Sequence, residues 1–112
     1  MSLDQYRLLG RSGLRVSPLA LGTMTFAVEG WGSSEEEAAR MVDIYIDRGG
    51  NFIDTALVYA DWIPGPRSTS EKAIGEWLKA RGLRDQITIA TKGGHPDLST
   101  MHISRLSHAE IT

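Results

Sequence analysis

Cysteine is absent from this 112-residue sequence, and so are long hydrophobic segments and a surplus of basic residues. Without cysteine, disulfide bonds, thiolate-ligated metals and a thiol nucleophile are all excluded. No run of about 18 apolar residues occurs, so we expect no membrane-spanning helix. The 12 Lys and Arg residues against 14 Asp and Glu residues give a net charge of −2. We therefore expect no basic face for nucleic acid.

The composition is that of one globular unit, with 41% hydrophobic and 23% charged residues. Residues 1–10 lack the basic-then-apolar layout of a secretion signal. Together with the lack of cysteine, this leads us to expect a cytoplasmic protein.

Strands and helices are predicted to alternate along the chain. Two short extended runs around the Gly-rich turn at residues 10–13 predict a β-hairpin. After it, the apolar runs 19–21, 51–56 and 87–92 predict three strands, and segments with apolar residues at helical spacing lie between them. This order predicts an α/β fold with a parallel sheet and right-handed crossovers.

Capping boxes, in which a serine is followed three residues later by a glutamate, mark three helix starts. They lie at 33–36 or 34–37, at 68–71 and at 107–110. Glycines 49–50 and 82 are predicted to end the first two helices. Only two residues follow the third box, so we expect the chain to end early within a larger fold.

Three ionisable residues lie at or just beyond the ends of the predicted strands. Asp54 lies near the end of its strand, Tyr59 lies in the next loop, and Lys92 closes the following strand. In parallel α/β folds, active and binding sites form at the carboxyl ends of the strands. Side-chain alternation places Asp54 and Lys92 on the face opposite Ile53 and Ile89, so we expect them to form an ion pair.

An ammonium group beside a phenol favours the phenolate and lowers the phenol's pKa from about 10. Tyr59 would then be a better proton donor near neutral pH, which suits protonation of a carbonyl oxygen during its reduction. The alternative is a buried ion pair near a loop tyrosine, with no chemical role. The spacing of the three residues leaves both interpretations open.

Four separated segments of the chain are YRLLGRSGLRVSPLALGTMTF, GGNFIDTALVYADW, STSEKAIGEWL and ITIATK. In this order they resemble the N-terminal part of the aldo-keto reductase family, over residues 6–92. The resemblance implies a partial (β/α)8 TIM barrel, in which an N-terminal hairpin precedes about three βα units. It also implies NADP(H) as the cofactor and a small aldehyde or ketone as the substrate.

The resemblance implies a role for each candidate residue. Tyr59 would be the general acid, Lys92 would lower its pKa, and Asp54 would pair with Lys92. The implied cofactor-binding residues are Gly22, Thr23, Met24 and Asp54. At Gly22, the lack of a Cβ atom suits close approach by a ligand.

The family's fourth catalytic residue, a histidine after the fourth strand, has no counterpart here. His95, His102 and His108 follow only the third strand, and we expect them to be solvated loop residues. Their spacing does not suit one helical face, so no metal site is expected. Trp31 and Trp62 are candidates either for a substrate-pocket wall or for loop packing.

We expect residues 1–112 to be the incomplete N-terminal portion of a barrel domain, with about three of the eight strands. As part of a complete barrel, the chain would reduce aldehydes or ketones with NADPH, and alone it would be inactive. The alternative is a non-catalytic, truncated relative that acts as an oligomerising or partner-binding module. Its open sheet edges would favour self-association.

Overall fold

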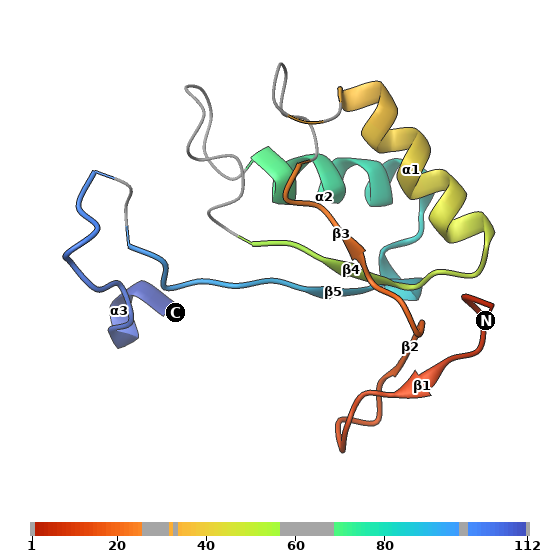
Figure 1. Cartoon of the computed structure of the whole chain (residues 1–112), viewed down its shortest axis with the longest axis horizontal. Coiled ribbons are helices and arrows are strands. Elements are labelled where there is room, and N and C mark those ends of the chain that lie inside the picture. Colours follow the sequence, from red (N-terminus) through yellow and green to blue (C-terminus); the bar gives the residue numbers. More distant parts are fainter. Residues whose placement is uncertain (1, 26–31, 33, 57–68, 97–98, 112) are drawn as a thin grey trace.

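The computed structural model describes residues 2–25, 32, 34–56, 69–96 and 99–111. Its elements, in chain order, are β1 (Arg7–Leu8), β2 (Arg15–Val16), β3 (Leu21–Gly22), α1 (Glu35–Asp47), β4 (Phe52–Asp54), α2 (Thr69–Arg81), the 3-10 helix η1 (Arg84–Gln86), β5 (Thr88–Ala90) and α3 (His108–Ile111) (Figure 1). Strands β1 and β2 form an antiparallel hairpin, and β3, β4 and β5 form a parallel sheet in that order. The predicted α/β class and element order are confirmed.

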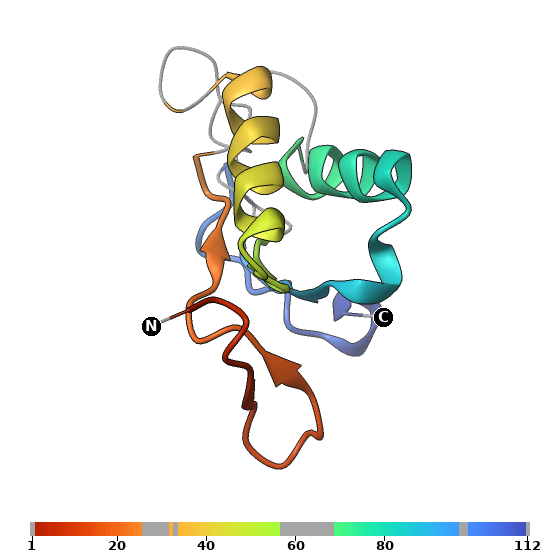
Figure 2. The same cartoon turned by 90° about the vertical axis from the view of Figure 1, so that its right-hand side faces the viewer.

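Helices α1 and α2 lie on the same face of the sheet, and the opposite face of β3–β5 carries no described helix (Figure 2). The hydrophobic core lies between these two layers. Its buried residues are Ala38, Val42, Tyr45, Ile53, Ala73, Ile74, Trp77, Leu78 and Ile87. Along β4, Ile53 is fully buried beneath the helices, whereas Phe52 and Asp54 are only half-buried. The predicted alternation of side chains is therefore confirmed, and the described strands do not close a barrel.

Helix α1 begins with the capping box at Ser34 and Glu37. The Ser34 hydroxyl accepts from the Glu37 N–H at 3.2 Å, and the Glu37 carboxylate accepts from the Ser34 N–H at 3.3 Å. The helix ends where the Gly50 N–H donates to the Tyr45 carbonyl at 2.9 Å and Gly49 takes a φ of 93°. Of the other expected caps, Ser68 lies outside the described residues. Helix α3 begins directly after Ser107 and is a single turn long.

The hairpin is attached to the end of the sheet at which the parallel strands begin. Ser17 is buried, and its N–H donates to the Asn51 side-chain oxygen at 2.8 Å. In return, the Asn51 N–H donates to the Ser17 hydroxyl at 2.8 Å, and its amide group donates to the Arg15 carbonyl at 2.9 Å. Tyr6 adds a hydrogen bond to the Gly49 carbonyl at 2.8 Å. These bonds lie at the end of the sheet opposite to the carboxyl ends of the strands.

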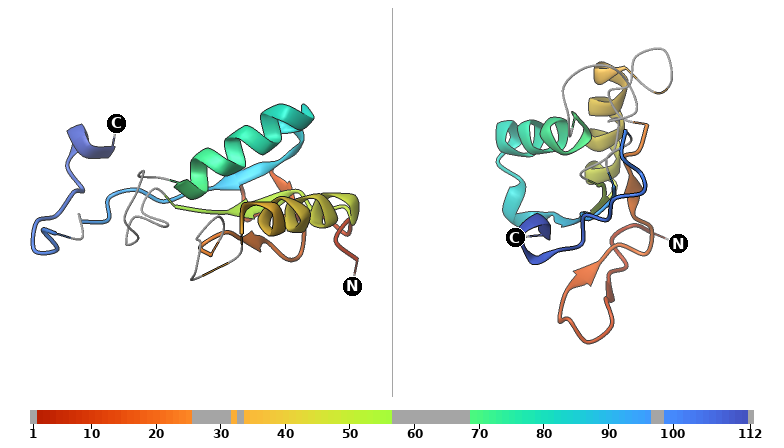
Figure 3. Two further views of the ribbon diagram at one scale, coloured as in Figure 1. Left: turned by 90° about the horizontal axis from the view of Figure 1, so that it is seen from above. Right: turned by 90° about the vertical axis from the view of Figure 1, so that its left-hand side faces the viewer.

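The molecule exposes more surface than a closed domain of its size. Its radius of gyration is 15.2 Å, against about 13 Å for a compact domain of this length. Its accessible surface is 7493 Å², against about 6,100 Å² for a compact monomer of this mass. Part of the excess comes from residues 91–96 and 99–111, which run away from the sheet (Figure 3). None of the described helices has the length and apolar character that crossing a bilayer requires.

Candidate active site

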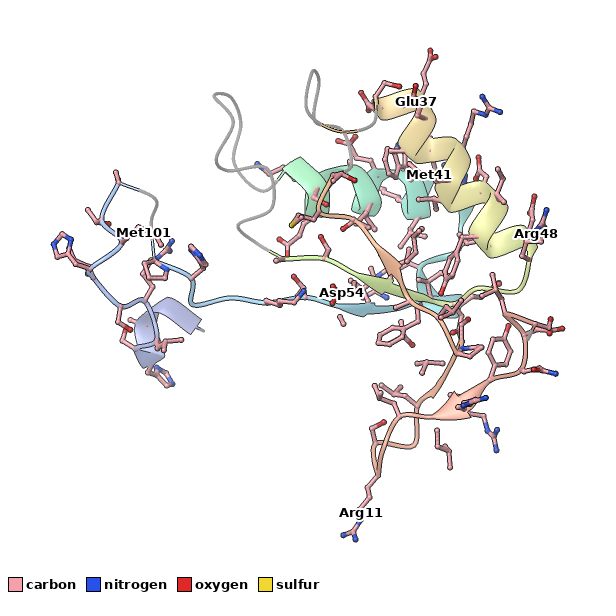
Figure 4. All side chains as sticks on the ribbon, viewed as in Figure 1. Arg11, Glu37, Met41, Arg48, Asp54 and Met101 are labelled. Atoms are coloured by element: carbon pink, nitrogen blue, oxygen red, sulfur yellow. The ribbon has the colours of Figure 1, made fainter. Side chains whose placement is uncertain are left out.

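An ion pair between Asp54 and Lys92 stands at the carboxyl end of the sheet. Asp54 ends β4 and is aligned with Ala90 of β5, so Lys92, two residues beyond Ala90, points to the same face. The Lys92 Nζ donates to both carboxylate oxygens of Asp54 at 3.0 Å. Figure 4 shows Asp54 at the strand end, away from the hairpin. The predicted pair is therefore present.

The pair is more exposed than the sequence led us to expect. The side chains of Lys92 and Asp54 keep 53% and 38% of their accessible surface. The reason is that no described helix covers this face of the sheet, so water reaches both groups. An exposed pair contributes little to stability, at most about 1 kcal/mol. Its main effect is geometric, because a third bond from Nζ to the Thr55 carbonyl at 2.8 Å fixes the position of the ammonium group.

The expected cofactor residues divide into two groups. Gly22 is aligned with Asp54 and exposed, and a Cβ atom added there would meet no atom within 4 Å. Met24 is also exposed. Thr23, by contrast, is fully buried, and its hydroxyl donates to the Asp54 carbonyl at 3.0 Å. Gly22 and Met24 are therefore exposed at this end of the sheet, while the Thr23 hydroxyl is already bonded within the protein.

Ser70, in the first turn of α2, is a residue that the sequence analysis missed. It is fully buried, and its hydroxyl lies 2.9 Å from the Thr23 carbonyl oxygen and 3.2 Å from the Thr55 hydroxyl. The signal in the sequence is a threonine directly after each of two strands, Thr23 after β3 and Thr55 after β4. Two hydroxyl groups at equivalent strand ends need a polar partner if a helix covers them.

The other candidates do not join this site within the described residues. His95 contacts the Pro96 carbonyl at 2.7 Å, and His102 and His108 are exposed. In the part of the chain that the structure describes, no group of three His, Cys, Asp or Glu residues could hold a metal ion. Tyr59, Trp31 and Trp62 lie outside the described residues.

Comparison with known proteins identifies the family to which this chain belongs. The model of the Aldo/keto reductase family matches residues 18–112. The chain therefore belongs to the aldo/keto reductase family, as the resemblance predicted.

Individual relatives agree with this assignment. The chain is 47% identical over 85 residues to an aryl-alcohol dehydrogenase of Phanerodontia chrysosporium whose name specifies NADP(+), covering 71% of this chain and 20% of that one. It is 41% identical over 90 residues to an uncharacterized 11.2 kDa protein of Pseudescherichia vulneris, covering 79% and 84%. An aldo-keto reductase of Bacillus halodurans, solved in its holo form, superposes with a TM-score of 0.62 at 34% identity, covering 81% and 26%. Across the first three curated relatives, the chain spans 20% to 42% of their length.

Proposed function

We propose that this chain supplies the proton-donating part of a carbonyl reductase site, within a complete (β/α)8 barrel that reduces an aldehyde or ketone with NADPH. The observation that carries the proposal is the Asp54–Lys92 pair at the carboxyl edge of a parallel sheet. In barrels of this kind the active site forms at this edge. Membership of the aldo/keto reductase family supports the same reaction class.

The chemistry that NADPH supplies when bound is donation of a hydride to the carbonyl carbon. Gly22, Met24 and Asp54 would lie beside its reactive end, because all three keep exposed surface at the carboxyl end of the sheet. Thr23 would act by holding the strand end, since its hydroxyl is bonded to the Asp54 carbonyl.

Tyr59 is proposed to donate the proton that the carbonyl oxygen gains in this reduction. It follows Ala56 by three residues, so the chain keeps its Cα within about 11 Å of that of Ala56. The Lys92 ammonium would stabilise the phenolate that remains and so lower the pKa of the phenol. Asp54 would keep that ammonium in place through its two 3.0 Å bonds.

The chain is proposed to be the incomplete N-terminal portion of a barrel domain and to be inactive on its own. Its sequence has no counterpart of the family's catalytic histidine, and no described helix covers the sheet face that bears Asp54 and Lys92. Without the remaining strands, substrate and cofactor cannot be held in a reactive geometry. The cytoplasmic location stays a prediction from the sequence.

A chimera tests this proposal. The chain replaces the matching N-terminal segment of the Bacillus halodurans enzyme, and carbonyl reduction is followed by NADPH consumption. We expect Tyr59→Phe to lower kcat by about 10²-fold or more while NADPH affinity is kept. Tyr6→Phe is the matched control, because its hydroxyl bonds Gly49 at the opposite end of the sheet. A fully active Tyr59→Phe chimera would refute the catalytic assignment.

The excess surface supports a second candidate, a non-catalytic module that binds a partner or a second copy. In the described sheet, β3 and β5 each have one unpaired edge. A shallow groove of about 320 Å³ also lies on the outer side of α1, lined by Glu37, Arg40, Met41 and Ile44. Light scattering after gel filtration and an NADPH titration of the isolated chain distinguish the two. A stable oligomer that binds no NADPH favours the module, and a monomer that binds NADPH contradicts it.

A further inference from the structure

Three buried hydroxyl groups form a cluster beneath the candidate active site. They belong to Thr23, Thr55 and Ser70, whose relative exposures are 0%, 1% and 0%. The Ser70 oxygen lies 2.9 Å from the Thr23 carbonyl oxygen, 3.0 Å from the Thr23 hydroxyl and 3.2 Å from the Thr55 hydroxyl. The cluster therefore joins the carboxyl ends of β3 and β4 to the first turn of α2.

One arrangement of protons satisfies the whole cluster. Ser70 donates to the Thr23 carbonyl, Thr55 donates to the Ser70 oxygen, and Thr23 donates to the Asp54 carbonyl. Because these groups are shielded from water, removal of one hydroxyl costs its partner a hydrogen bond that water does not replace. This loss favours a shift of the neighbouring backbone.

The cluster is linked to the Lys92 ammonium group through a single residue, Thr55. Thr55 holds Ser70 through its side chain and Lys92 through its carbonyl, at 2.8 Å. Its N–H also donates to the Ala90 carbonyl at 2.8 Å. Asp54, the other partner of Lys92, has its carbonyl bonded by both the N–H and the hydroxyl of Thr23. Asp54 and Thr55, the two residues that bond the Lys92 ammonium group, are thus both bonded to the hydroxyl cluster or part of it.

A second contact fixes the same helix turn from the outside. The Thr91 hydroxyl donates to the Glu71 carboxylate, which joins the segment just before Lys92 to the residue after Ser70. The first turn of α2 is therefore held to all three strand ends, by Ser70 at β3 and β4 and by Glu71 beyond β5.

We propose that Ser70 and Thr55 are positioning residues, which fix Lys92 and Asp54 through the buried hydroxyl cluster. The role in catalysis rests on the proposed function, but the positioning of Lys92 does not require it. A purely structural role would lower stability without changing the environment of the Lys92 ammonium group.

The test uses the 112-residue chain, whose three lysines are at 72, 79 and 92. Limiting acetic anhydride acylates them in competition, and mass spectrometry gives the reactivity of Lys92 relative to exposed Lys79. Bonds to Asp54 and Thr55 protect Lys92, so we expect Ser70→Ala and Thr55→Val to raise this ratio about two- to fivefold. Asp54→Asn, which removes a direct partner, is the positive control.

Two further variants separate positioning from packing. Thr55→Ser keeps the hydroxyl and loses a methyl group, and we expect it to keep the original ratio. Ser17→Ala removes a buried hydroxyl that is also hydrogen-bonded, to Asn51, but lies at the other end of the sheet. We expect it to leave the reactivity ratio of Lys92 to Lys79 unchanged, although it lowers stability. Circular dichroism identifies any variant that unfolds, in which case Ser70→Ala and Thr55→Val substitute for one another.

An unchanged ratio in folded Ser70→Ala or Thr55→Val would overturn the proposal. So would a Thr55→Ser variant that raises the ratio as much as Thr55→Val. If the ratio rises as expected while the Tyr59→Phe chimera stays fully active, positioning holds and the proposed catalytic role fails.

Discussion

The ammonium nitrogen of Lys92 lies 3.0 Å from both carboxylate oxygens of Asp54, although 38 residues separate them in the chain. The two side chains meet because β4 and β5 are parallel and in register, which puts Asp54 level with Ala90. Both side chains are exposed, so water screens their attraction and the pair adds little stability. Its main effect is to fix the position of the Lys92 ammonium group.

Replacement of Asp54 by asparagine should therefore be nearly neutral for folding. We expect the free energy of unfolding of the isolated chain to fall by less than about 1 kcal/mol, because both side chains are over a third exposed. Urea denaturation measures this change. A loss above about 3 kcal/mol, typical of a broken buried pair, would contradict the exposed geometry.

The core between the helices and the sheet should carry most of the stability. Leu78 of α2 is fully buried, and we expect Leu78→Ala to cost about 2–5 kcal/mol, which includes the cavity that it leaves. Leu8→Ala, at a site that is 58% exposed in the hairpin, is the matched control and should change stability by about 0.5 kcal/mol or less. Equal losses for the two variants would show that the core is elsewhere.

Two glycines are expected to respond in opposite ways to replacement by alanine. At Gly50 the added Cβ atom would overlap the Tyr45 ring, so Gly50→Ala should destabilise the protein by about 1–3 kcal/mol. At Gly75, within α2, nothing lies within 4 Å of the added atom. Gly75→Ala should stabilise the helix by about 0.5–1 kcal/mol. Thermal unfolding measures both variants, and a stabilising Gly50→Ala would contradict the close contact with Tyr45.

Helices α1 and α2 are linked by a salt bridge whose response to salt can be measured. Arg81 donates through Nε to Asp43 Oδ1 at 2.5 Å and through Nη2 to Oδ2 at 2.9 Å. The hydrogen bond to Asp43 raises the pKa of Arg81 above its already high ordinary value, so the arginine stays charged throughout the pH range in which stability is measured. We expect Asp43→Asn to cost about 0.5–1 kcal/mol at low salt and less in 1 M NaCl. A cost that is independent of salt would show that the contact is not electrostatic.

Much of this fold could be predicted because hydrophobic periodicity determines which face of an element is buried. The alternation of Ile53 with Asp54 correctly indicated the core face of β4 and the ion-pair face opposite it. The capping box at Ser34 was likewise readable, because its two partners are close in sequence.

The hydrogen-bond partners of buried polar groups could not be predicted from the sequence, because they depend on how elements that are distant in the chain pack together. Tyr45 occurs at a core position of α1, yet its hydroxyl lies 2.7 Å from the Leu19 carbonyl oxygen and 2.8 Å from that of Phe52, where it joins the segment before β3 to β4. Ser70 resembles an ordinary residue of a helix start, and only the folded arrangement reveals that it bonds two strand ends.

We propose that the Lys92 ammonium acidifies the Tyr59 phenol. The most direct measurement is the pH profile of kcat for the chimera, with Lys92 intact and as Lys92→Met. A general acid must be protonated, so the rate should fall as pH rises through the pKa of Tyr59, and with Lys92 intact this fall should occur well below pH 10. We predict that Lys92→Met moves the fall toward about pH 10 as well as lowering the maximum rate. Two profiles that fall at the same pH would contradict the account.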